Sequence, residues 1–125
     1  MKSPNSYNFR LRTLTDDILI GSVGLFEIQW THQNASMGIA IGDPAYWNKG
    51  YGTDAMKLIL GYGFRELNLY RISSTTIAYN FRAMKAHEKV GFRREGLQRN
   101  SIKREGQRFH LIYYGILRTE WVKYS

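Results

Sequence analysis

The sequence contains no cysteine, so it has neither a disulfide framework nor a thiolate nucleophile. It also lacks any apolar run near the roughly 20 residues that cross a bilayer. Nothing after Met1 has the charged start and apolar middle of a signal peptide. An apolar content of 43% and an aromatic content of 14% exclude a disordered chain. At 125 residues we expect one domain, located in the cytoplasm, with no membrane partner.

Acidic residues are few: 10 Asp and Glu stand against 18 Lys and Arg, giving a net charge of +8. The excess lies in the second part of the chain. Residues 1–81 hold seven Lys and Arg and six Asp and Glu, whereas residues 82–125 hold eleven and four. This asymmetry favours an anionic partner: a phosphate-bearing ligand, a nucleic acid or the ribosome. A basic surface without function is the alternative, and no nucleic-acid-binding motif is present.

Two glycines, Gly50 and Gly52, stand one residue apart in residues 47–55, after an apolar strand-like run and a turn. A long apolar helix follows, extending to about Leu67. Glycines at a helix start let the backbone approach a ligand closely. The free N–H groups of the first turn and the helix dipole then form an anion site. With Lys49 as a nearby cation, this stretch predicts a phosphate-binding loop.

Three phosphate-binding loops resemble this stretch, and spacing separates them. A P-loop places its lysine after the last glycine, but Lys49 precedes Gly50. The dinucleotide pattern G-x-G-x-x-[GA] fits Gly50, Gly52 and Ala55, yet the next predicted strand ends near Asn80 without a carboxylate. The third is the acyl-coenzyme A pyrophosphate loop, [RQ]-x-x-G-x-[GA].

Four blocks support this third interpretation: residues 47–55, 80–83, 88–92 and 113–121. In their order and spacing the chain resembles GNAT-type N-acetyltransferases, in particular the Rim type, which acetylates the N-terminal amine of ribosomal proteins. The resemblance extends from about residue 14 to residue 121. The N-terminal strand and two helices of the family are largely missing here, so we expect an N-terminally short form.

The hydrophobic pattern predicts an α/β (α+β) fold with a mixed, mostly antiparallel sheet around a central β-α-β-α unit. Asn80 is a suitable N-cap for the second helix, and Gly91 a suitable stop. The expected strands are residues 9–14, 18–30, 35–41, 71–79, 93–101 and 108–117. The expected helices are the one that residues 47–55 open, which extends to about Leu67, and residues 81–90. The resemblance implies that residues 37–41 and 72–79 form a splayed pair of parallel strands.

The resemblance also implies that acetyl-coenzyme A, as co-substrate, lies between the splayed strands. Ile39 and Ile41 would bond its pantetheine arm, and Asn80 and Arg82 would contact the same arm. Lys85, one helical turn further on, could reach a phosphate or could be an ordinary solvated residue. The residues that would hold the pyrophosphate are Asn48, Lys49, Gly50, Tyr51, Gly52 and Thr53. No metal is expected, because the three histidines have no ligand spacing.

Acetyl transfer needs a neutral amine, a stabilised oxyanion and a protonated leaving thiolate. His87 occupies the position of the family's tyrosine acid, and a histidine can protonate a thiolate. A packed, structural histidine is the alternative. Ser36 replaces the family's glutamate base. Glu27 on the preceding strand could act through water, or could be a solvated carboxylate, and an amine that is already neutral could attack directly.

Three functions therefore remain open. The first is acetyl-coenzyme A-dependent acetylation of a primary amine, on a protein N-terminus, a polyamine or a small amino compound. The second is acyl-coenzyme A binding without catalysis, and the third is RNA or ribosome binding through the basic half. Because the short form would expose apolar sheet and helix surface, we also expect a homodimer.

Overall fold

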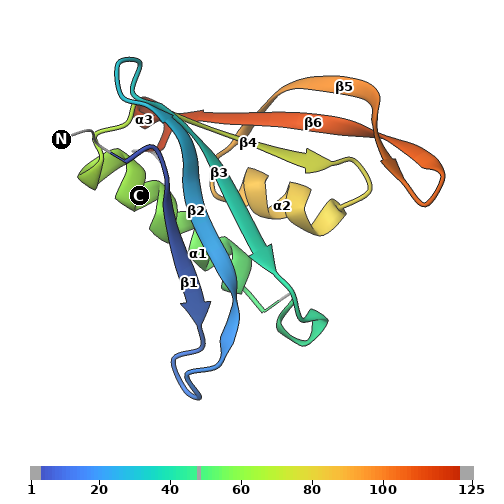
Figure 1. Cartoon of the computed structure of the whole chain (residues 1–125), viewed down its shortest axis with the longest axis horizontal. Helices are drawn as coiled ribbons and strands as arrows, with labels where there is room; N and C mark the ends of the chain where they lie inside the picture. Colours follow the sequence, from blue (N-terminus) through green and yellow to red (C-terminus); the bar gives the residue numbers. More distant parts are fainter. Residues whose placement is uncertain (1–3, 48, 122–125) are drawn as a thin grey trace.

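The computed structural model describes residues 4–47 and 49–121. Its elements are arranged as Figure 1 shows. In chain order they are β1 (Tyr7–Arg12), β2 (Leu19–Gln29), β3 (Asn34–Ile41), η1 (Pro44–Tyr46), α1 (Tyr51–Gly61), η2 (Tyr62–Glu66), β4 (Arg71–Ile77), α2 (Phe81–Lys89), β5 (Arg93–Arg104), β6 (Gln107–Leu117) and α3 (Arg118–Trp121). Within these ranges no helix combines the length and the apolar character that crossing a lipid bilayer demands.

All six strands form one mixed sheet in the order β1-β2-β3-β4-β6-β5. Every neighbouring pair is antiparallel except β3 and β4, which are parallel because α1 connects them as a crossover helix. The sheet places the β-α-β-α unit in the middle, between the β1–β2–β3 meander and the β5–β6 hairpin. The predicted fold class is therefore confirmed.

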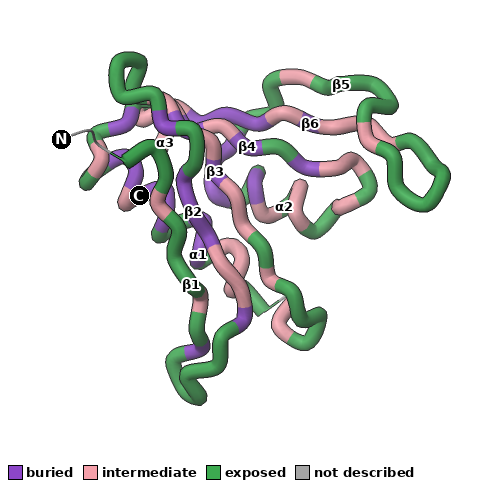
Figure 2. The backbone as a smooth tube through the Cα atoms, viewed as in Figure 1, coloured by how far each residue is buried: buried purple, intermediate pink, exposed green. Residues whose placement is uncertain are grey.

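Both long helices cover the same face of the sheet, as the side chains that point to one side of β4 demonstrate. Ile72 is fully buried and its Cδ1 approaches Gly63, just after α1. Ser74, two residues later, bonds His87 of α2. Since residues i and i+2 of a strand point to the same side, α1 and α2 share one face. Figure 2 shows burial concentrated where the central strands meet α1, whereas β5 and the tip of the β5–β6 hairpin are largely exposed.

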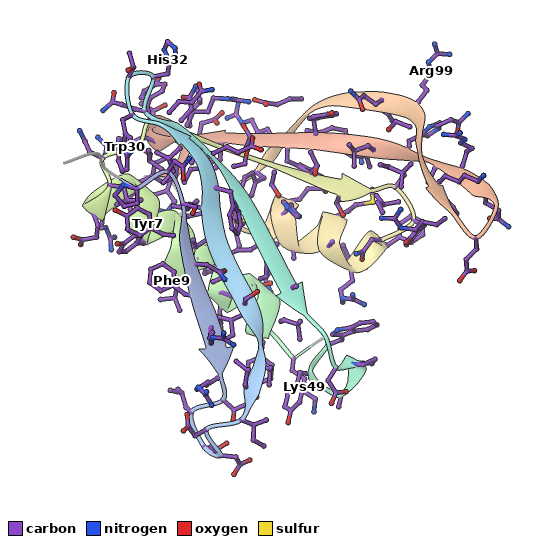
Figure 3. All side chains as sticks on the ribbon, viewed as in Figure 1. Tyr7, Phe9, Trp30, His32, Lys49 and Arg99 are labelled. Carbon is purple, nitrogen blue, oxygen red and sulfur yellow. The ribbon has the colours of Figure 1, made fainter. Side chains whose placement is uncertain are left out.

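The core joins β2, β3, β4 and β6 to α1 and η2. Its fully buried side chains include Leu25, Phe64, Ile72 and Ile116. At the edge of the sheet, Tyr7 and Phe9 of β1 pack edge-on against Tyr62, with ring centroids 5.6 and 5.2 Å apart. Figure 3 shows both aromatic side chains on the α1 side of β1. The rings thereby seal one flank of the core.

The helix that was predicted to extend to about Leu67 changes character within its length. It is α-helical to Gly61 and then widens into the π-helical turn η2. A Cβ at Gly63 would lie 2.9 Å from Ile72 Cδ1 and 3.0 Å from Leu25 Cδ1, so glycine permits the close packing of this turn on the sheet. The short helices η1 and α3 lay outside the predicted elements, because one turn leaves little periodic pattern.

Candidate functional site

The parallel strands β3 and β4 separate soon after they pair. Their ladder ends at Ser36 opposite Ser73, whereas β3 continues to Ile41 and β4 to Ile77. Figure 1 shows the two arrows diverging toward their ends. The splayed parallel pair implied by the resemblance is thus present, and backbone edges beyond the last rung face an opening between the strands.

Backbone geometry shows which residues of β3 face this opening. Trp47 Nε1 donates to Ile41 O at 2.8 Å, while Gly42 N donates to Ile20 O on the opposite edge at 3.3 Å. Backbone groups of alternate strand residues point to the same edge, so Ile39 directs its N–H and C=O toward β4. Ile39 is therefore oriented to bond an extended amide chain, whereas the Ile41 carbonyl already has the indole as its donor.

The opening continues into a cleft of about 430 Å³ bounded by β3, the start of α1 and one face of α2. Eight of the residues that were predicted to bind the cofactor line this cleft. Two are apolar residues of β3, three belong to the glycine loop and three lie at the start of α2. These are Ile39, Ile41, Gly50, Gly52, Thr53, Asn80, Arg82 and Lys85. The fold brings together residues from positions 39 to 85, as an elongated ligand requires.

The start of α1 presents backbone donors to this cleft. Gly50 precedes the helix with a φ of 84°, a conformation that L residues rarely adopt, and as the N-cap residue it has no side chain to bond the first turn. A Cβ at Gly50 would have no neighbour within 4 Å, and one at Gly52 would meet Ile41 Cδ1 at 3.9 Å. The first-turn N–H groups and the positive end of the helix dipole can therefore meet an anion.

The cleft-facing side of α2 is basic. Arg82, Lys85 and Lys89 follow the three- and four-residue spacing of one helix face, and all three line the cleft. Asn80 begins this helix, with its Oδ1 accepting from Ala83 N at 3.1 Å. Together with the start of α1, these cations suit the phosphates of a polyanionic ligand.

Trp47 and Arg82 meet across the cleft, although 35 positions separate them in the sequence. The guanidinium carbon lies 3.7 Å from the centroid of an indole ring that is itself anchored on Ile41 O. This cation–π contact links the end of β3 to the start of α2. Trp47 and Lys89 were not among the predicted site residues. The spacing from Arg82 through Lys85 could have revealed Lys89, whereas no local pattern marks Trp47 as the partner of Arg82.

Other predicted residues lie elsewhere. Lys49 is exposed in the loop before α1, as Figure 3 shows, and like Tyr51 it does not line the cleft. Asn48 lies outside the described residues. Glu27 is exposed in a bulge of β2, with a φ of 52°, and β3 separates it from β4. In the part of the chain that the structure describes, no three His, Cys, Asp or Glu side chains gather as a metal site.

His87 is buried beneath the cleft. It is only 2% exposed, its ring stacks on Tyr114 at 4.8 Å between centroids, and Phe92 meets its edge. Nδ1 lies 2.7 Å from Ala83 O, and a carbonyl can only accept, so Nδ1 carries the proton. Nε2 therefore accepts from Ser74 Oγ, also at 2.7 Å. Burial lowers the pKa of His87 below its usual value of 6.5, against smaller raising effects of Ala83 O and Glu88.

We expect this burial to make stability fall in mild acid. Because the pKa of His87 is lowered in the folded state, the unfolded chain binds the extra proton first as pH drops below 6.5. The free energy of unfolding should hold above that pH and decline below it. Urea unfolding between pH 7.5 and 5 measures the slope, and His87→Gln should flatten it. An equal slope in the variant would assign the effect to other groups.

Comparison with known proteins places the chain in a family. The model of the acetyltransferase (GNAT) domain matches residues 1–93. The probable N-acetyltransferase YjcK of Bacillus subtilis (strain 168) is 37% identical over 107 residues, which cover 85% of this chain and 59% of YjcK. The uncharacterized N-acetyltransferase YnaD of the same organism is 34% identical over 120 residues, covering 96% of this chain and 69% of YnaD.

A solved structure agrees with these sequence relatives. Spermidine N-acetyltransferase from Vibrio cholerae, in complex with CoA and spermine, superposes with a TM-score of 0.86 at 27% identity. The match covers 94% of this chain and 69% of that one, so the chain spans from about three fifths to two thirds of its relatives' length. Sequence, fold and cleft agree, and the chain belongs to the GNAT family of acetyltransferases.

Proposed function

We propose that this chain binds acetyl-coenzyme A in the cleft between β3 and α2 and transfers the acetyl group to a primary amine. The observation that carries the proposal is the cleft itself. Its β3 edge, with Ile39, suits the amides of the pantetheine arm, and the start of α1 at Gly50 and Gly52 suits the pyrophosphate. The cations of α2 suit the remaining phosphate. Membership of the GNAT family supports the same assignment.

The expected chemistry is direct attack. The amine nitrogen bonds to the thioester carbonyl carbon, the carbon–sulfur bond breaks with its electron pair on sulfur, and one proton moves from nitrogen to sulfur. The chain's contribution is to hold the thioester at the narrow end of the opening, near Ser36 and Ser73, and to manage that proton. Neither Glu27 nor His87 lines the cleft. The roles of Glu27 as general base and of His87 as general acid therefore remain predictions.

We rank the candidate acceptors by charge. Spermine and spermidine are polycations, and the related Vibrio cholerae structure contains spermine. This chain has a net charge of +8, and like charge disfavours a polycationic acceptor. We therefore rank a single primary amine first, on a protein N-terminus or a small molecule. The Rim-type assignment within the family remains a prediction of the same kind.

The test has two stages. Calorimetric titration with acetyl-coenzyme A should give a one-to-one complex, whereas ATP and NAD, which carry phosphates without the pantetheine arm, should bind far more weakly. Thiol release is then followed with monoamines, N-terminal peptides and spermidine. We expect turnover with a monoamine or a peptide. Binding without release on any acceptor would reject catalysis, and no binding would reject the cleft assignment.

A second candidate is acyl-coenzyme A binding without catalysis. The observation that favours it is the burial of His87, together with serine at position 36, where the family's usual base is expected. For this candidate we expect binding in the calorimetric titration but no thiol release with any amine, so the same two-stage experiment separates it from the first. The basic half of the chain also leaves RNA or ribosome binding as an alternative. Such binding would weaken steeply with salt, which distinguishes it from both.

The predicted homodimer and cytoplasmic location remain proposals. Exposed apolar side chains on the sheet, among them Phe26 at 37% and Leu97 at 44% exposure, support self-association. Light scattering coupled to size exclusion decides the oligomeric state. A monomer mass across the micromolar range would reject the dimer.

A further inference from the structure

Ser74 and His87 form a hydrogen-bonded pair at the base of the opening between β3 and β4. Ser74 is the first residue of β4 beyond the last parallel rung at Ser73, and its side chain points to the face covered by α2. Its Oγ lies 2.7 Å from His87 Nε2, and the two residues are 6% and 2% exposed. A buried hydroxyl and a buried imidazole therefore stand where the two strands begin to part.

The pair is adjacent to the cleft. Ala83 and Ala86 of α2 line the cleft, Ala83 O holds the Nδ1 proton of His87, and Ala86 precedes His87 in the chain. Alanine methyls therefore form this part of the wall. Ser74 lies between the imidazole and β4, because Nε2 bonds Ser74 on β4 while Nδ1 bonds back into α2.

The proton positions in this pair are determined by its acceptors. Since the Ala83 carbonyl can only accept, Nδ1–H is the donor there and Nε2 has the free lone pair. Ser74 then donates its hydroxyl proton to Nε2, and its own oxygen lone pairs remain available for another donor. A nucleophile or proton carrier beside a base, with the base oriented by a third group, is the arrangement that acid–base catalysis uses.

We propose that Ser74 relays the reaction's proton between substrate and His87, which makes Ser74 a catalytic residue and His87 a positioning residue. The inference rests on the proposed acetyl transfer. After the amine nitrogen bonds to the carbonyl carbon, the ammonium gives a proton to Ser74 Oγ as the serine proton passes to Nε2. When the carbon–sulfur bond breaks, the thiolate takes a proton from Ser74 as Nε2 returns its own. One proton moves from nitrogen to sulfur, and the pair is restored.

The surroundings of His87 suit a transient carrier. Burial lowers the pKa of His87, so an imidazolium formed during the reaction readily releases its proton. The charged and titratable groups beside the ring are Glu88 on α2 and Tyr114 on β6, and Arg94 on β5 lies opposite Tyr114. Glu88 accepts from the Tyr114 hydroxyl at 3.1 Å, and Arg94 is the ladder partner of Tyr114 across the β5–β6 pair. Glu88 and Arg94 thus carry opposite charges beside the same phenol, and Ser74 is the partner of Nε2.

The first test needs no acceptor amine. Coenzyme A is bound to the wild-type protein, to Ser74→Ala and to Thr76→Val, and its thiol is titrated by thiolate absorbance. Thr76 is a matched control, because it is buried on the same face of β4, two residues further along. If Ser74 reaches the sulfur, its oxygen accepts from the bound thiol, because its own proton is donated to Nε2, so the thiol should titrate at a higher pKa in the wild type and in Thr76→Val than in Ser74→Ala. Identical titration in all three would overturn the relay.

The second test uses turnover. Ser74→Ala should lower kcat about 100-fold, within the usual contribution of acid–base catalysis, with KM for acetyl-coenzyme A unchanged. His87→Gln should lower kcat similarly and remove the rise of kcat from acid to neutral pH, and Ser74→Thr should restore much of the rate. An unchanged kcat in both Ser74→Ala and His87→Gln would show that the pair has only a structural role.

The outcomes also separate this inference from the proposed function. If the wild type binds coenzyme A but acetylates no amine, the proposed transfer fails and the relay fails with it, while the thiol titration still decides whether Ser74 contacts the sulfur. If acetylation occurs and the Ser74 and His87 variants match the wild type, the function stands and the relay alone is rejected.

Discussion

Replacing Gly52 with valine is expected to abolish measurable acetyl-coenzyme A binding while leaving the fold intact. A Cβ at Gly52 meets only Ile41 Cδ1, at an ordinary contact distance of 3.9 Å, so the protein itself has room for the side chain. Valine is also a better helix residue than glycine. Its methyl groups would occupy the space over the first turn of α1, where the pyrophosphate is proposed to lie. We expect affinity to fall at least 100-fold, or about 3 kcal/mol.

Calorimetric titration checks this, with thermal unfolding as the test of folding. Gly96→Val is the matched control, because a Cβ at Gly96 has no neighbour within 4 Å and lies on β5, away from the cleft. Gly52→Ala should give a smaller loss than valine. Binding of the Gly52→Val protein at wild-type strength would show that the glycine loop is not the phosphate site.

Replacing Leu25 with alanine is expected to destabilise the protein by about 3 kcal/mol, since large-to-small changes in a core cost roughly 2–5 kcal/mol. Leu25 is fully buried at the centre of β2, and its Cδ1 reaches the turn at Gly63. Alanine would leave a cavity between the sheet and η2. For a chain of this size the melting temperature should fall by about 10 °C.

Urea unfolding measures the free-energy difference directly. Leu58→Ala provides the control, because Leu58 on α1 is 71% exposed and its truncation should change stability by less than about 0.5 kcal/mol. Equal losses from the two variants would contradict the packing of β2 against α1 and η2 described above.

Local signals predicted most of the elements and the start of the cleft. Asn80 caps α2 through Ala83 N, and Gly91 ends that helix with a φ of 108°, both as expected from residue type. The glycine loop at Gly50 and Gly52 begins α1 as its sequence indicates. These features depend on neighbours within a few residues, so they can be predicted from the sequence alone.

What could not be predicted depends on contacts between distant residues. The stacking of Arg82 on Trp47 depends on how β3 and α2 are placed around the cleft. Likewise, the sequence shows His87 at a helical position, but only packing against Tyr114 and Ser74 makes it a buried, neutral ring. The bulge at Glu27, inside the strand predicted for residues 18–30, arises from the register between β2 and β3.

The early end of the β3–β4 ladder also has a mechanical consequence. The sheet consists of two well-paired halves, β1–β2–β3 and β4–β6–β5, and the parallel ladder that joins them ends at Ser36 and Ser73. A ligand whose amides bond both strand edges would join the two halves with hydrogen bonds that the strands do not make to each other. Its binding free energy would add to the stability of the whole domain once the ligand concentration exceeds Kd. The stability of the domain should therefore rise with the fraction of clefts that hold ligand.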